Sequence, residues 1–291
     1  MPADAMPTLA ILFLVVGALY ASVGHAGASG YLAVMALVGV APESMRSTTL
    51  AVNVVVATIA FGHYAAAGHF SWRFLLPFLI GSTPAAFLGG AIALPVEWLR
   101  LAIGAVLAWS AVRMAIVNLP AARTPQPPRD PSIAVKVSAG ALLGFAAGLT
   151  GTGGGIFLSP LILLCGWAEP KRTAATASLF ILVNSLSGLG GLLSAGWTPP
   201  LDLVPLAIAA AVGGFVGALL GSRKATPRVL NLLLAAVLAV AAAKLLAPAI
   251  ASLGDSASSR LDEVQSLPDR DVALHSIDER GERLEAFGPV G

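Results

Sequence analysis

The stretch GLTGTGGGIFLSP, residues Gly148 to Pro160, decides the fold, because five glycines and two threonines interrupt long apolar runs there. In the interior of a helix each glycine costs about 1 kcal/mol relative to alanine. An unpaired backbone amide in hydrocarbon costs several kcal/mol more. The stretch therefore predicts a break in a membrane helix and raises the question of what the break is for.

The composition is that of an integral membrane protein. Hydrophobic residues make up 57% of the chain and charged residues only 11%, far below the roughly 25% charge of soluble domains. Apolar runs of the length that crosses a bilayer recur along the chain, so we expect an all-α polytopic protein of about eight transmembrane helices. These runs cover residues 7–24, 47–67, 73–94, 98–118, 133–149, 173–195, 201–221 and 229–250, and shorter apolar pieces at 30–41 and 156–168 predict re-entrant half-helices.

The chain divides into two membrane repeats, a linker and a tail. The first repeat is expected at 7–118 and the second at 133–250, with a Pro-rich linker at 119–132 between them. Residues 251–291 carry nine acidic and four basic side chains, a net charge of −5. That composition predicts an acidic, largely disordered C-terminal tail.

An internal repeat relates the two membrane halves. Sliding the second half onto the first at an offset of 127, which grows to 128 after one extra residue, aligns glycines, a threonine and a proline. The aligned residues include Gly24 with Gly151, Gly27 with Gly154, Gly39 with Gly166, Thr49 with Thr176, Gly68 with Gly196 and Pro77 with Pro205. The first half therefore has its own glycine break, GHAGASGYL at 24–32. Whether the halves run parallel or inverted stays open, because basic residues are balanced between the two sides.

Corresponding glycine-interrupted segments in duplicated halves indicate the binding site of a secondary transporter. Where a half-helix begins, its amides carry partial positive charge and bind anions, and glycine permits the close backbone approach that this requires. The alternative is that the glycines only let helices pack closely. The predicted substrate-binding residues in the two breaks are Gly24, His25, Gly27, Ser29, Gly30, Thr150, Gly151, Thr152, Gly153, Gly154 and Gly155.

A polar stripe at helical spacing follows each break. It includes Thr49 and Asn53 in the first half, and Thr176 and Asn184 in the second. Such a stripe should face protein or water instead of lipid, so we add these four residues to the predicted site; interhelical hydrogen bonding is the alternative. Three basic residues at the starts of the striped helices either attract anions or anchor the helix ends: Arg46, Lys171 and Arg172.

Residues 7–250 resemble the TauE/SafE family of sulfite and organosulfonate exporters. The resemblance is most specific in GLTGTGGGIFLSPLILL and the following PKRTAATASLFILVNS. It implies a duplicated multi-pass transporter of the bacterial inner membrane with an anionic, sulfur-containing substrate. Where the family repeats a glycine triplet in its first half, this chain has GHAGASG, which puts His25 opposite Thr152.

The predicted function is secondary export of a small anion, most simply sulfite or an organosulfonate, coupled to the proton gradient or the membrane potential. Nucleotide-binding motifs are missing from the sequence, and we expect no metal, no cofactor and no nucleic acid; the expected partners are the anion and the lipid bilayer. Candidate proton acceptors are His25, His63 and His69.

Two other function classes are compatible with the sequence. GASG at Gly27 to Gly30 matches the serine motif of rhomboid-type intramembrane proteases, and Ser29 would then need His63 or His69 as its base. The other class is a non-transporting membrane scaffold that acts through the tail.

Overall fold

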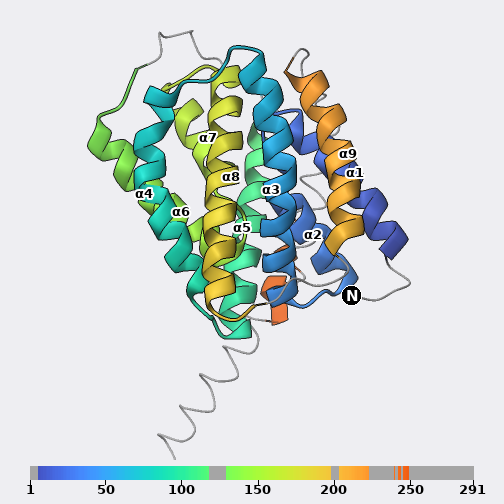
Figure 1. Ribbon diagram of the computed structural model, residues 1–291. Coiled ribbons are helices and arrows are strands. Elements are labelled where there is room, and N and C mark those ends of the chain that lie inside the picture. Colours follow the sequence, from blue (N-terminus) through green and yellow to red (C-terminus); the bar gives the residue numbers. More distant parts are fainter. Residues whose placement is uncertain are drawn as a thin grey trace, which may run out of the picture. The chain divides into compact units, whose positions relative to one another are not determined.

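The computed structural model describes residues 6–117, 129–197, 203–222, 239, 242–243 and 245–248. All regular structure in these ranges is α-helical, which confirms the predicted all-α polytopic class (Figure 1). The helices are α1 (Met6–Ala21), α2 (Ala28–Val38), α3 (Pro42–Ala66), α4 (Trp72–Ala91), α5 (Val96–Val117), α6 (Ile133–Thr150), α7 (Gly155–Leu164), α8 (Pro170–Ser194) and α9 (Leu203–Gly221).

Five of these helices, α3, α4, α6, α8 and α9, are long and apolar enough to cross a membrane. The predicted runs at 7–24 and 98–118 correspond to α1 and α5, and the two short apolar pieces correspond to α2 and α7. Large apolar side chains such as Ile11, Leu142 and Ile208 are exposed on the helix surfaces, as expected where lipid takes the place of water. The tail at 251–291, most of the linker at 119–132 and most of the predicted run at 229–250 lie outside the described residues, and the domain boundaries stay predictions.

Both predicted breaks are present. The first break, residues 22–27, separates α1 from α2, and the second break, residues 151–154, separates α6 from α7. The N-cap residues Gly27 and Gly154 have φ angles of 100° and 79°. L side chains rarely adopt this left-handed conformation, so glycine is needed at both positions.

The backbone repeats this pattern at the spacing of the predicted duplication. Four pairs of glycines with positive φ stand 127 or 128 residues apart in the chain, and each pair lies at the same kind of helix end or turn. They are Gly24 and Gly151, Gly27 and Gly154, Gly39 and Gly166, and Gly68 and Gly196. The two halves therefore share one backbone plan.

The two halves of the chain pack against each other through two pairs of helices. Helix α4 packs along α6, and α1 packs along α9. Both contacts depend on glycines spaced four apart, the arrangement that lets membrane helices approach closely. A Cβ on Gly213, Gly217 or Gly221 would clash with the carbonyl oxygens of Leu14, Ala18 and Ser22 in turn. Because the residue numbers rise together in both helices, α1 and α9 run parallel.

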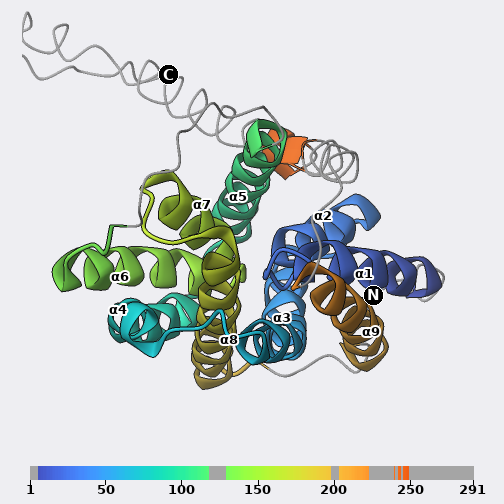
Figure 2. The same cartoon turned by 90° about the horizontal axis from the view of Figure 1, so that it is seen from above.

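The equivalent helices α3 and α8 lie side by side between these two pairs (Figure 2), and their contacts show that they run antiparallel. Leu50 near the start of α3 lies against Gly188 near the end of α8, whereas Tyr64 near the end of α3 packs with Ala174 near the start of α8. Since α3 and α8 occupy the same place in their halves, the repeats have inverted topology. This answers the question that the charge pattern left open.

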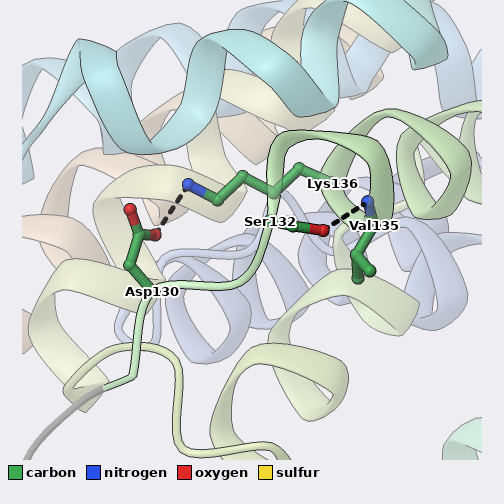
Figure 3. Close-up of polar contacts among 4 residues, drawn as sticks. All are labelled: Asp130, Ser132, Val135 and Lys136. Carbon is green, nitrogen blue, oxygen red and sulfur yellow. Dashed lines mark hydrogen bonds and ion pairs between the residues drawn. The ribbon is translucent and has the colours of Figure 1, made fainter.

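A buried cation fixes the start of α6 (Figure 3). Ser132 caps the helix by accepting a hydrogen bond from the Val135 amide at 3.4 Å. The Lys136 Nζ lies 2.6 Å from the Asp130 carboxylate, and it also stands 4.9 Å from the centre of the Phe74 ring in α4. At this end the ion pair holds Lys136 beside the start of α6, and the cation–π contact with Phe74 joins α6 to α4.

The glycine contacts predict opposite effects for one added methyl group. Gly217→Ala should lower the free energy of unfolding by about 1–3 kcal/mol, because the new Cβ would force α9 away from α1. The matched control Gly62→Ala, in α3 with open space around it, should raise it by up to about 1 kcal/mol through helix propensity. Thermal unfolding in detergent measures both, and shifts of the same sign would contradict the packing assignment.

Candidate functional site

The two breaks meet, although they lie far apart in the sequence. The Nε2 atom of His25 in the first break is 3.2 Å from the carbonyl oxygen of Gly155, the first residue of α7. A cavity of about 10 Å³ lies between them, close to the least room that one water molecule needs. Its lining comes from both halves: Tyr20, His25, Ala26, Gly27, Ala28, Ser29, Thr152, Ile156 and Ile181.

Two helix N-termini converge on this cavity. Helices α2 and α7 begin at Ala28 and Gly155, and no side chain caps either of them. The first amides of a helix have no acceptor within the helix, and together they give that end about half a positive charge. Ala28, Ser29 and Ile156, from the first turns of these helices, line the cavity. The helix ends therefore give the cavity a positive electrostatic potential, although its lining contains no lysine, arginine, aspartate or glutamate.

Hydroxyl groups supply further polar atoms around the breaks. The Tyr20 and Ser29 hydroxyls lie 2.8 Å apart and are buried. In the second break, Thr150 donates to the Ala146 carbonyl, and its hydroxyl oxygen is 3.0 Å from that of Thr152. Because Thr150 has already used its proton, Thr152 is the member of this pair whose proton can be given to a ligand or to Thr150.

Helices α3 and α8 bring unpartnered polar side chains to the second break. Asn53 is fully buried, and within the described residues neither its amide nitrogen nor its amide oxygen has a partner. Its nitrogen lies 3.1 Å, and the Ser185 hydroxyl 2.8 Å, from the point where a Cβ on Gly153 would stand. The Ser185 hydroxyl is also buried without a partner there. Leaving such groups unpaired is costly, and intramembrane polar groups of this kind mark functional sites.

The predicted site residues fall into three groups. The cavity brings together His25, Gly27, Ser29 and Thr152, with Gly153, Gly154 and Gly155 forming the adjoining turn and start of α7. Thr49 and Asn184 are buried and, like Asn53, have side chains without partners among the described residues. The others make internal contacts: Gly24 packs on Ala174, Gly30 on Val16 and Gly151 on Arg46, while the Thr150 and Thr176 hydroxyls donate to the Ala146 and Arg172 carbonyls.

Arg46 is neither a surface attractor of anions nor an end anchor. Its side chain is only 4% exposed, and it passes Gly151 on its way to the last turns of α4 and α6. There the guanidinium donates to four carbonyl oxygens, those of Gly89, Gly90, Ile92 and Gly148, at 2.6 to 3.1 Å. The charge of Arg46 thus lies against the negative ends of two helix dipoles.

The protease alternative needs a contact between Ser29 and a histidine base. Ser29 instead pairs with Tyr20. The His63 ring nitrogen Nδ1 is 2.9 Å from the Ile59 carbonyl, and the ring lies edge-on to Phe215. Among the described residues, Ser29 and His63 are therefore engaged with different partners.

Comparison with known proteins decides the family. The family described as Sulfite exporter TauE/SafE matches residues 9–245, which include both breaks and the helices around them. The chain belongs to the TauE/SafE family. A relative of this TauE/SafE protein, "Probable membrane transporter protein y4hK" from Sinorhizobium fredii (strain NBRC 101917 / NGR234), is 40% identical over 240 residues, covering 82% of this chain and 97% of the relative.

No solved structure matches this TauE/SafE protein. The family and the relative establish the coarse function: the protein is a multi-pass membrane transporter.

Sequence reasoning missed Tyr20, Ile156, Ile181 and Ser185 in this TauE/SafE site. Tyr20 lies in the last turn of an ordinary apolar helix, and the isoleucines carry no polar signal. Ser185 directly follows the predicted Asn184, and the packing of α8 beside the second break brings its hydroxyl to Gly153, where Asn53 of α3 also lies.

Unpaired and paired serines should respond oppositely to removal of the hydroxyl. Ser185→Ala in this TauE/SafE protein should leave the free energy of unfolding unchanged or raise it by about 1–3 kcal/mol, because no hydrogen bond is lost. The matched control Ser110→Ala removes a buried hydroxyl that donates to the Val106 carbonyl at 2.6 Å, and should lower it by about 0.5–1.5 kcal/mol. Thermal unfolding tests this, and equal destabilisation would mean that Ser185 has a structural partner.

Proposed function

We propose that this protein is a secondary transporter that exports a small anion, sulfite or an organosulfonate, through a site at its paired helix breaks. One observation carries the proposal: two helix N-termini from opposite halves, neither capped by a side chain, face one cavity. The family description names sulfite export, and the relative is described as a probable membrane transporter.

The donors at the site match the oxygens of sulfite and sulfonates. Backbone amides at the starts of α2 and α7 offer hydrogen bonds along two directions. Hydroxyls of Ser29 and Thr152 stand in the cavity lining, and the amide of Asn53 and the hydroxyl of Ser185 lie beside Gly153. Several convergent donors of this kind suit an oxyanion, which accepts hydrogen bonds at every oxygen.

Transport requires the site to open. A cavity of about 10 Å³ has room for little more than a single water molecule, so an oxyanion with three oxygens enters only after the breaks move apart. In transporters with inverted repeats, the two halves or bundles rock around a site at their interface. The contact between His25 and Gly155 crosses that interface here, and we propose that it separates in each cycle.

The driving force is the membrane potential, the proton gradient or both. An inside-negative potential drives an anion out of the cell with about 2.3 kcal/mol per unit charge for each 100 mV. A proton could be carried by His25, whose two ring nitrogens lie 3.2 Å from the carbonyl oxygens of Val23 and Gly155. We place the protein in the bacterial inner membrane, where both gradients exist.

Flux into proteoliposomes tests the function. Labelled sulfite, a simple sulfonate and sulfate are offered to vesicles containing the purified protein, with a pH gradient or a potassium diffusion potential imposed. We expect saturable sulfite or sulfonate flux above that of empty vesicles, and faster flux when the potential favours anion movement. Folded protein that moves none of the three would overturn the proposal, and flux indifferent to both gradients would remove the coupling.

Matched glycine variants test the role of the second break. Gly154→Ala should lower the transport rate by about tenfold or more, equivalent to about 1.4 kcal/mol, because its Cβ would stand 2.8 Å from the Phe180 ring and 3.1 Å from Ala147. Gly166 also has a positive φ but open space around it, so Gly166→Ala carries the same backbone strain without the contact. If both variants transport equally well, the geometry of the second break does not control the rate.

A further inference from the structure

We infer that the site selects anions by charge and takes a single negative charge: hydrogen sulfite or a sulfonate, in preference to the sulfite dianion or sulfate. This inference rests on the proposed function and concerns the same site. Two observations support it: the charges around the cavity, and the neutralisation of the C-termini of α4 and α6 by the single charge of Arg46.

The positive character of the site comes from the backbone. The nine residues that line the cavity include no lysine, arginine, aspartate or glutamate. The two converging N-termini each carry about half a unit of positive charge, which together make about one unit. Tyr20 and His25 are the titratable members of the lining. A neutral His25 donates through only one of its two ring nitrogens, both of which face carbonyl oxygens. A proton carried by His25 would add one positive charge, so the charge balance is that of the neutral imidazole, and sulfate is compared with methanesulfonate at the basic end of the pH range.

Beyond the lining, the unpartnered side chains at the second break are also neutral. Asn53 and Ser185 contribute dipoles next to Gly153 but no net charge. They can orient an oxyanion and satisfy its oxygens. They cannot neutralise a second negative charge.

Arg46 provides an internal reference for this balance. Its single positive charge, buried between α3 and the last turns of α4 and α6, is met by the carbonyl oxygens of two helix C-termini. Each C-terminus carries about half a unit of negative charge. One positive charge is therefore neutralised here by two helix C-termini. By the same count, the two N-termini of α2 and α7 neutralise one negative charge on a ligand.

A second negative charge on the ligand would be left uncompensated in a site that lies among buried residues. Removing an unpaired charge from water is strongly unfavourable. A monoanion is neutralised by the two helix ends, whereas a dianion keeps a net charge in the site once the breaks have opened to admit it. We therefore expect binding of the monoanion to exceed that of a dianion of similar size by at least about tenfold.

The test is competition at several pH values, using the full-length protein in proteoliposomes. Flux of labelled sulfite is measured against unlabelled methanesulfonate and sulfate, from slightly acidic to slightly basic pH. Methanesulfonate keeps one charge and sulfate keeps two throughout, so changes in their inhibition report only the titration of the protein. Sulfite itself changes from hydrogen sulfite to the dianion over this range.

We expect the half-saturating concentration of total sulfite to rise with pH in proportion to the loss of hydrogen sulfite, after correction by methanesulfonate. Sulfate should inhibit at least about tenfold more weakly than methanesulfonate. Inhibition by sulfate as strong as that by methanesulfonate, or a half-saturating concentration that falls with rising pH, would overturn the charge inference while leaving anion transport intact. No saturable flux of any of these anions would defeat the proposed function and the inference with it.

A charge added to the lining gives a second readout. Ile156→Lys places a cation beside the start of α7, and it should improve inhibition by sulfate relative to methanesulfonate by at least about tenfold. Ile156→Met is the control for the changed shape and should keep the preference of the natural chain. A folded Ile156→Lys protein with an unchanged preference would contradict the charge balance.

Discussion

Every backbone amide and carbonyl inside a bilayer needs a partner, and the rest of this structure follows from that constraint. A continuous helix meets it within one segment, but this chain interrupts two segments with glycine-rich breaks. It faces the two amide-rich ends toward each other across a small cavity. The carbonyl oxygens at the ends of α4 and α6 accept hydrogen bonds from the buried guanidinium of Arg46. The starts of α2 and α7, which no side chain caps, are where we propose that a ligand binds.

These helix ends are held together by packing between helices of different halves. Close glycine contacts bind α4 to α6 and α1 to α9, so neither half packs as an independent bundle. Helices α3 and α8 lie side by side between the two pairs and place their polar side chains at the second break. The glycines therefore have two separate structural tasks: those spaced four apart let helices pack closely, and those clustered in a row lie where helices end and begin.

Much of this could be predicted from the sequence, because glycine clusters and apolar lengths are local signals. The breaks, the duplicated pattern of glycines and the positions of α2 and α7 agree with the structure. The sequence could not predict that Asn53 and Ser185 both lie beside Gly153, since the repeat aligns Asn53 with Phe180, and only the antiparallel crossing of α3 and α8 brings Asn53 to the second break. Arg46 was expected to attract anions or to anchor a helix end, because its carbonyl partners come from two helices that the sequence does not show to be neighbours.

An inverted repeat alone would make the two sides of the protein equivalent. Arg46 removes that equivalence, because the residue at its repeated position is Thr173, whose hydroxyl reaches only the Ala168 carbonyl, at 3.5 Å. The ends of α4 and α6 are thus joined by a charged group with five hydrogen bonds. At the opposite side, the Tyr64 hydroxyl donates one hydrogen bond to the Ser22 carbonyl. The two sides of one inverted plan therefore differ in the charge and the number of the hydrogen bonds that join their helix ends, an asymmetry that duplication by itself would not produce.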